Sequence, residues 1–240
     1  EKAEVEHKYD QLISSLSRLG IHSDGVIIGN GSSDFTLETR RYDFEVDGQK
    51  FALLDVPGIE GKEGKVMGNI WTAVQKAHAV FYVTGKAAAP QSGDDNNKGT
   101  LEKIKEHLGG QTEVWSLFNK RITNPMQLDK DELIGEGERK SLKVLDDKMK
   151  EQLGDNYKGT KIFSAYPTFL ALARCLVPGS KASKNKKKFL AKNEVKKLLQ
   201  KTGFTDFFDF MTTNLVKDYK KKIIHSNFNK ACDVVKTAAD

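Results

Sequence analysis

The chain has 240 residues, of which 38% are hydrophobic and 30% are charged, and its net charge is +6. This size and composition suit one large folded domain with an appendage, and they exclude a collagen-like chain and a small disulfide scaffold. The two cysteines form no CxxC pair, which indicates a reducing compartment, and no apolar run approaches the roughly 20 residues that span a bilayer. We therefore expect a cytoplasmic protein. Because the sequence begins at Glu1 rather than Met, we also expect a piece of a longer chain.

The positive charge is concentrated in the C-terminal quarter. Residues 179–240 contain 15 lysines and 6 acidic residues, a net charge of +9, so the preceding residues carry −3. Such a basic segment suits contact with nucleic acid, anionic lipid or an acidic partner, and equally a solvated lysine-rich helix face. We predict three parts, namely a helical segment at 1–24, an α/β domain at 25–178, and a lysine-rich loop with C-terminal helices at 179–240.

The N-terminal elements follow from hydrophobic periodicity. Apolar residues at helical spacing predict a helix over 1–19 that stops at Gly20. After a Gly-, Ser- and Asp-rich stretch, alternation of apolar and polar residues predicts a strand at 42–46. Asp47-Gly48 is a hairpin turn signal, and a second strand is predicted at 51–54.

Further along, short apolar runs alternate with helical patterns. This alternation predicts an α/β fold, a three-layer sandwich with a mostly parallel sheet and a helical C-terminal extension. Cys175 lies in an apolar run and is expected in the core, and the phenylalanines at 204–210 predict a helix face packed on the domain. The predicted elements are helix 70–76, strand 79–83, helix 101–108, strand 114–118, a charged helical region at 129–153 broken near 135–137, strand 161–163, a loop at 178–188, helices at 194–201 and 204–224, and a third helix that ends near Asp240.

Three of the predicted strands end in polar sequences, which are DVPG at 55–58, Asn119-Lys120 and Ser164-Ala165. In a parallel sheet the carboxyl ends of the strands share one edge, where ligands bind. Asp55 is suited to hold Mg²⁺ through water, and a glycine N–H can approach a γ-phosphate. An Asn-Lys pair can frame a purine ring, and a Ser-Ala turn can offer an N–H to an exocyclic oxygen.

In this order and at these strand ends, the chain resembles the P-loop GTPases. DVPG matches the DxxG motif of switch II, Asn119-Lys120 matches the first half of the NKxD motif, and Ser164-Ala165 matches the SA motif. Thr39 precedes its strand as the switch I threonine does in the Era, TrmE and dynamin-like branches, and Thr36 is the second candidate. The segment 202–208, followed by a basic helix, is similar to the end of the G domain in bacterial dynamin-like proteins.

The resemblance implies a P-loop NTPase-like fold and hydrolysis of GTP with Mg²⁺. It implies that Thr39 and Asp55 hold the metal and that the Gly58 N–H senses the γ-phosphate. It also implies that Asn119-Lys120 and Ser164-Ala165 frame the base. Guanine nucleotide is then the ligand, and self-association through the G domain or the C-terminal helices is a further expectation.

The phosphate loop of that family is missing from this sequence. No GxxxxGK[ST] sequence is present, and the glycines at 29–31 lack the lysine. Without those N–H groups, tight binding of a triphosphate has no evident source, so we expect this chain alone to be inactive. We favour truncation, with the loop upstream of Glu1. A degenerate domain in which residues 26–28 fill the central strand position is the alternative.

A second departure lies in the guanine motif, where Ile122 stands in place of Asp. That carboxylate accepts the N1 and N2 hydrogens of guanine, so its loss predicts weaker base discrimination. Asn124 is a candidate substitute, and Ile122→Asp is expected to raise the preference for GTP.

Two other classes of function remain open. One is a pseudo-GTPase interaction module without nucleotide turnover. The other is a basic nucleic-acid-binding domain, for which steep salt dependence is expected. In either case the lysine run at 181–188 is the expected contact with an anionic surface.

Overall fold

The computed structural model places most of the chain in two compact units, each assembled from segments that are far apart in sequence. Unit 1 consists of Glu1–Ile28, Lys120–Leu133 and Phe163–Asp206, and unit 2 of Gly29–Asn119, Ile134–Ile162 and Phe207–Asp240. The three-part division predicted from the sequence stays a prediction. The structure describes residues 2–26, 39–57, 63–93, 99–108, 113–217 and 219–239.

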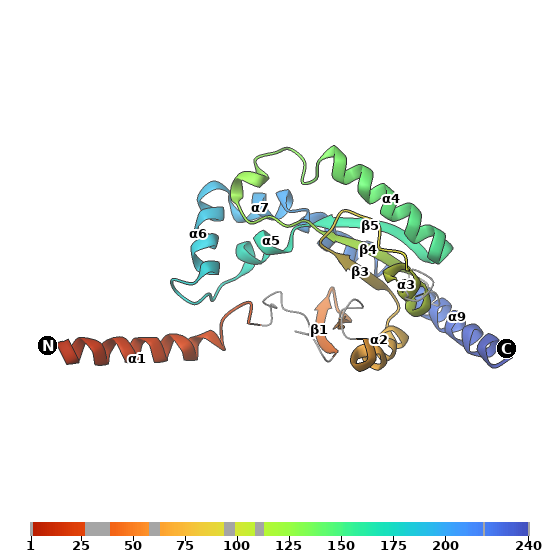
Figure 1. Cartoon of the computed structure of the whole chain (residues 1–240), viewed down its shortest axis with the longest axis horizontal. Helices are drawn as coiled ribbons and strands as arrows, with labels where there is room; N and C mark the ends of the chain where they lie inside the picture. The colour runs from red at the N-terminus through yellow and green to blue at the C-terminus, as the bar shows by residue number, and fades with distance from the viewer. Residues whose placement is uncertain are drawn as a thin grey trace. The chain divides into compact units, whose positions relative to one another are not determined.

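A three-stranded parallel sheet lies at the centre of unit 2 (Figure 1). Its strands are β3 (Val80–Thr84), β4 (Val114–Asn119) and β5 (Tyr157–Phe163), and their order in the sheet is β3-β4-β5. β3 pairs in parallel with β4, with Val80 opposite Val114. The nearly continuous apolar sequences of β3 and β4 are typical of strands covered on both faces. The predicted α/β class with a parallel sheet is therefore confirmed.

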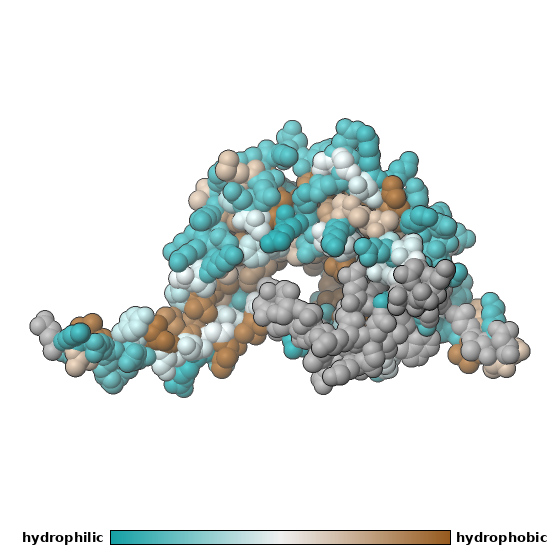
Figure 2. All heavy atoms as spheres, in the orientation of Figure 1, coloured by the Kyte–Doolittle hydropathy of each residue, from teal (hydrophilic) through white to brown (hydrophobic). Residues whose placement is uncertain are grey.

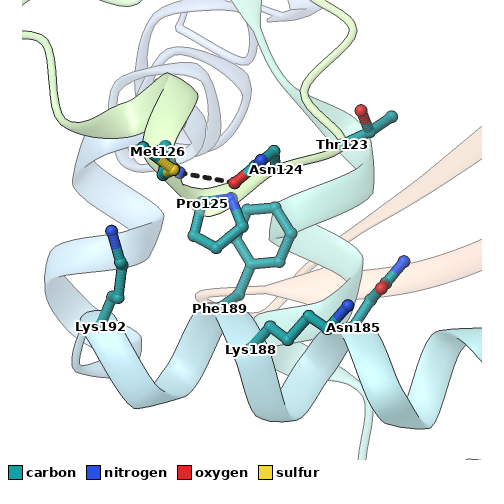
Figure 3. Close-up of a pocket in the computed structure, with 8 residues that line it drawn as sticks. All are labelled: Thr123, Asn124, Pro125, Met126, Asn185, Lys188, Phe189 and Lys192. Atoms are coloured by element: carbon teal, nitrogen blue, oxygen red, sulfur yellow. Dashed lines mark hydrogen bonds between the residues drawn. The ribbon is translucent and has the colours of Figure 1, made fainter.

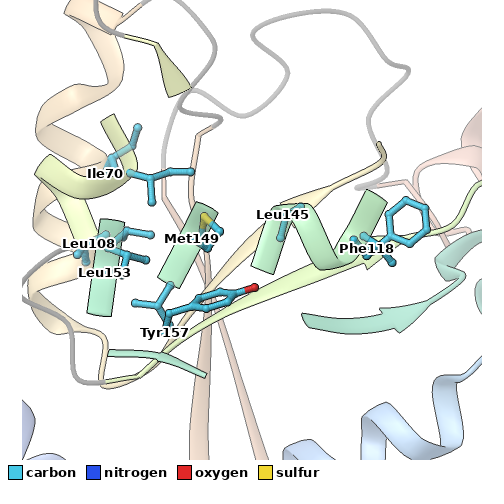
Figure 4. Packing of buried hydrophobic residues seen from close by; sticks show 11 residues of the cluster. Ile70, Leu108, Phe118, Leu145, Met149, Leu153 and Tyr157 are labelled. Carbon is cyan, nitrogen blue, oxygen red and sulfur yellow. The ribbon is translucent and has the colours of Figure 1, made fainter. Parts of the chain in front are cut away.

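One face of this sheet carries the larger hydrophobic core. Ile104, Leu145 and Met149 are almost fully buried there against Val114 and Phe118 of the middle strand (Figure 4). Helical spacing of apolar residues gives each helix one buried stripe. The helices that contribute are α2 (Glu63–Lys76), α3 (Thr100–Leu108) and α4 (Glu136–Leu153), and the short helix η2 (Gly154–Asn156) leads into β5.

The opposite face of the sheet is aromatic. Trp115 of β4 packs edge-on against Phe210 at 4.7 Å between ring centroids, and Phe81 of β3 contacts Phe207 and Phe210. The Lys161 Nζ lies 4.1 Å from the centroid of the Phe210 ring. Helical residues thus cover both faces, which agrees with the expected three layers. The predicted packing of the 204–210 phenylalanines is confirmed for Phe207 and Phe210, whereas Phe208 is 48% exposed. The covering elements are α8 (Phe204–Asp209) and the π-helix η3 (Phe210–Asn214).

The two strands predicted on either side of Asp47-Gly48 form a separate antiparallel sheet. β1 (Arg40–Val46) pairs with β2 (Gln49–Asp55), and the turn has φ of +50° at Asp47 and +76° at Gly48, as a two-residue hairpin requires. The expectation that the DVPG strand joins the parallel sheet is wrong for the described residues, because β2 pairs only with β1 there. β1 alternates polar and apolar residues and most residues of β2 are exposed, which suits a sheet with an exposed face.

Unit 1 is mainly helical and has its own core. Ile122, Leu170, Phe189 and Leu198 are each 1% exposed or less. In contrast, α1 buries no residue, and hydrophobic side chains are visible along it (Figure 2). The helices of this unit are α1 (Lys2–Gly20), the 3₁₀ helix η1 (Pro125–Leu128), α5 (Ala165–Leu172), α6 (Lys181–Lys192) and α7 (Val195–Lys201).

Two sequence predictions in this unit are wrong. The lysine run predicted as a loop is helical, because the Ser180 hydroxyl caps α6 by accepting the Ser183 N–H and because Phe189 anchors the opposite face in the core. Cys175 was expected in the core but is exposed, since α5 already ends at Leu172.

The C-terminal helical pattern is interrupted. The predicted helix 204–224 breaks after η3, and α9 (Tyr219–Ala239) follows. Lys222 forms an ion pair with Glu113 at 2.9 Å, and Lys230 donates to the Gln75 and Ala77 carbonyls at 2.8 and 2.6 Å. These contacts hold α9 on unit 2. Among the described helices, none is both long and apolar enough to cross a membrane.

Candidate functional site

The ends of β4 and β5 are joined by hydrogen bonds at their carboxyl edge. The Lys120 N–H donates to the Phe163 carbonyl at 2.8 Å, and the Ser164 hydroxyl donates to the Lys120 carbonyl at 2.7 Å. Ser164 is fully buried, whereas Asn119 and Lys120 are half-buried. Of the three strand ends expected to share one edge, these two do so, because parallel pairing aligns them.

A buried polar cluster holds Ser164 in place. Its N–H donates to the Thr202 carbonyl at 2.8 Å, and its carbonyl accepts the Thr168 hydroxyl at 2.8 Å. The Thr168 and Thr202 hydroxyl oxygens are 3.0 Å apart. Sequence analysis did not find Thr168 or give Thr202 a role, and the only signal was Gly203, whose φ of +71° turns the chain directly after α7. Ala165 begins α5 immediately after this cluster.

The end of the β1–β2 hairpin brings the two predicted metal ligands to one place. Arg40 pairs with Asp55 in the antiparallel register, so Thr39 lies one residue beyond that pair. Thr39 is half-buried and Asp55 is exposed. Asp55 is in a different sheet from Asn119, and Ser164 directly follows β5 of that second sheet. Gly58 and the alternative ligand Thr36 lie outside the described residues.

The donor set at this hairpin end is compatible with Mg²⁺. Mg²⁺ prefers oxygen ligands and is commonly held by one or two protein groups, while water and substrate phosphates supply the rest. The Asp55 carboxylate and the Thr39 hydroxyl meet that requirement. Over the described part of the chain, no group of three or more His, Cys, Asp and Glu side chains forms a complete cage, so a metal here would need phosphate or water ligands as well.

The loop after Lys120 does not offer the carboxylate position of a guanine motif. Ile122 is 1% exposed and belongs to the core of unit 1. The Asn124 side-chain oxygen accepts the Met126 N–H at 3.0 Å and caps η1, and Gln127 completes the capping box. The Asn124 oxygen, which was the candidate substitute for the missing carboxylate, therefore already accepts a hydrogen bond within the chain. A carboxylate introduced at 122 would be buried, so a higher preference for GTP is no longer the expected result of that change.

Among the described residues, the side chain with the largest change in pKa is Tyr157, in the core of unit 2. The Tyr157 hydroxyl lies 2.5 Å from Asp146 Oδ1 and 3.0 Å from Ser116 Oγ, and the Thr160 hydroxyl donates to the same carboxylate at 2.8 Å. Burial, followed by the contact with Asp146, raises the pKa of Tyr157. The network joins β4, β5 and α4 within the core and is structural.

Comparisons of this chain with family models, curated proteins and solved structures give no significant match.

Proposed function

We propose that this chain is part of a GTP-binding, GTP-hydrolysing switch protein of the dynamin-like or Era/TrmE-like kind. The observation that supports it best is the joined carboxyl edge of β4 and β5, where the Ser164 hydroxyl donates to the Lys120 carbonyl. Ligands of parallel α/β sheets bind at this edge. The fold and motif order are consistent with the proposal.

In this proposal the two strand ends of the parallel sheet frame the base. Asn119 supplies amide hydrogen-bonding groups, and the Lys120 stem stacks on the ring. Ser164 and Ala165 contribute main-chain groups at the start of α5. Because buried Ser164 fixes the main chain of both loops, this half of the site is preorganised.

In the same proposal, residues at the end of the β1–β2 hairpin bind the metal and the phosphates. Asp55 and Thr39 would hold Mg²⁺, which when bound neutralises charge on the transferring phosphoryl group. The Gly58 N–H would approach the γ-phosphate. Loss of that phosphate would release the segments around Thr39 and Gly58, and the C-terminal helices would transmit the change. The exposed apolar residues Ile224, Phe228 and Val235 of α9 offer a surface for self-association.

A pseudo-GTPase interaction module is the second candidate. It is favoured by burial of Ile122, by the occupied Asn124 oxygen and by the absence of a phosphate-loop sequence. Such a module would keep one conformation with or without nucleotide. A nucleic-acid-binding domain is a weaker third candidate that rests on the lysines of α6. Its binding would fall steeply with salt and would not respond to GTP.

The decisive experiment uses the complete protein with Asp55→Ala. We expect loss of most GTP hydrolysis, because the metal loses its anchor. Asp43→Ala is the matched control, since Asp43 is an exposed hairpin carboxylate that pairs only locally, with Arg41 at 2.7 Å. Multiple-turnover activity of Asp55→Ala within about threefold of the parent would reduce Asp55 to a turn residue and contradict the proposal.

For this 240-residue chain alone, we expect feeble GTP binding or none. The backbone N–H groups and lysine of a phosphate loop provide most of the attraction for a triphosphate, and the sequence lacks them. Calorimetric titration with a GTP analogue and Mg²⁺ measures this directly. Micromolar binding would show that other residues hold the phosphates.

A further inference from the structure

A pocket of about 350 Å³ lies within unit 1, between the loop that follows Lys120 and helix α6 (Figure 3). This volume is in the range of small-molecule sites. None of the residues assigned to nucleotide binding above lines it. Its main lining residues are Asn124, Pro125, Asn185, Lys188, Phe189 and Lys192.

The floor of the pocket is apolar and rigid. Phe189 is fully buried and Pro125 is buried, and the two rings overlap in the view of Figure 3. Met126 lines the pocket as well and is 64% exposed. Phe189 and Pro125 have almost no accessible surface, so they support the pocket from below, and the apolar side chain open to a ligand is that of Met126.

The polar lining is cationic and rich in donors. Lys188 is exposed and makes no hydrogen bond or ion pair with any residue that the structure describes. Lys192 makes only a loose contact with Asp129, at 3.4 Å and with both side chains about half exposed. The Asn124 oxygen is occupied by the Met126 N–H, so its NH₂ is the group left to donate.

Helix α6 concentrates positive charge along the side that borders the pocket. Lys181, Lys184, Lys188 and Lys192 follow one another at intervals of three and four residues, which places them on one face of the helix. Lys186 is held differently, since its ammonium group donates to the Ala173 carbonyl. The exposed lysines therefore raise the local concentration of anions next to the pocket.

We propose that this pocket binds an organic phosphate, with the phosphate between Lys188 and Lys192 and the carbon portion on Met126. Two ammonium groups and an amide donor match the charge and the several acceptor oxygens of a phosphate monoester better than those of a single carboxylate. The phosphate is carried by a soluble ester or by a lipid headgroup. The proposal is independent of the GTP site, because no residue is shared.

The test uses this chain without nucleotide or Mg²⁺, with phenyl phosphate as the probe. Binding is followed by calorimetry and by the NMR signals of the Asn124 and Asn185 side-chain amides. We expect saturable binding, and we expect Lys188→Gln and Lys192→Gln each to weaken it by about tenfold, as for loss of a charge-assisted hydrogen bond. Lys184→Gln is the matched control, since it removes the same charge from the same helix face outside the pocket, and its effect should stay below about twofold.

Two further arms distinguish the source of the phosphate. Inorganic phosphate should bind more weakly than phenyl phosphate, because it makes no apolar contact with Met126. Vesicles containing phosphatidic acid should bind the chain, with the same sensitivity to Lys188→Gln, only if the headgroup of a lipid can enter. The proposal would be overturned if Lys184→Gln and Lys188→Gln lowered the affinity for phenyl phosphate equally, or if the amide signals did not respond to phenyl phosphate. Either result would mean that anions are attracted only diffusely to the lysines of α6.

Discussion

The two strand ends proposed to form one nucleotide site are built very differently. At the end of β4 and β5, buried Ser164 connects two chain segments through hydrogen bonds to Lys120 and Thr202. At the end of the hairpin, backbone register alone brings Thr39 and Asp55 together, and Asp55 is exposed. In the proposed function, the first end would be the rigid side that frames the base, and the second would be ordered only when the ligand binds, as a switch requires.

The largest expected loss of stability comes from a substitution at Ile122, in the loop that directly follows the end of β4. Ile122→Asp places a carboxylate in the core of unit 1, so we expect destabilisation by about 4 kcal/mol or more. Denaturant unfolding measures this change. Arg121→Asp is the control, because the neighbouring arginine is exposed and its replacement should cost little. Similar stabilities for the two variants would mean that Ile122 is not in a packed core.

A smaller loss of stability is expected when the hydrogen bond between Ser164 and Lys120 is removed. Ser164→Ala removes the hydroxyl that donates to the Lys120 carbonyl and leaves that carbonyl without this donor, so a loss of about 1–3 kcal/mol is expected. Ser17→Ala on exposed helix α1 serves as the comparison and should be close to neutral. If both substitutions are neutral in thermal unfolding, the two strand ends are not held together by this bond.

The pH dependence of stability tests whether the rigidity extends along β4 and β5. Burial raises the pKa of Tyr157, so the folded chain keeps a proton that the unfolded chain releases near pH 10. The contribution of Tyr157 to the free energy of unfolding is complete below about pH 10. It is lost as the pH rises above about 10, by up to about 1.4 kcal/mol per pH unit. Tyr157→Phe should remove this component from unfolding curves measured between pH 9 and 11, whereas Tyr219→Phe should retain it.

The smallest effect is expected at the hairpin end. Asp55→Asn should change the free energy of unfolding of this chain by no more than about 0.5 kcal/mol, because the side chain is exposed. The proposed function predicts that the same change impairs GTP hydrolysis. A large loss of stability would show that Asp55 is a structural residue, and the contrast between the two ends would disappear.

Patterns that act over a few residues were predicted well from the sequence. The Asp47-Gly48 turn, the strands on either side of it and the apolar strands at 80–84 and 114–119 were predicted with small errors at their ends. Each of these depends on turn conformation or on the period of apolar residues. Such preferences are local, so no knowledge of packing is needed to detect them.

Part of the candidate site was also predictable. The meeting of Lys120 with Ser164 follows from parallel pairing, which aligns the carboxyl ends of neighbouring strands. The helix over 181–192 was missed, because its stability depends on the packing of Phe189 rather than on its lysines. Tertiary packing commonly overrides the local preference of such a segment.

The sequence by itself determined the alternating α/β order, the positions of the polar strand ends and the basic character of the C-terminal part. Only the tertiary structure decided that the DVPG strand lies in a hairpin sheet of its own and that Ile122 is a core residue. It also decided that Thr202 supports the turn at Ser164. Strand partners, burial and contacts between distant residues depend on which segments meet in space, and a one-dimensional pattern of residues does not contain that information.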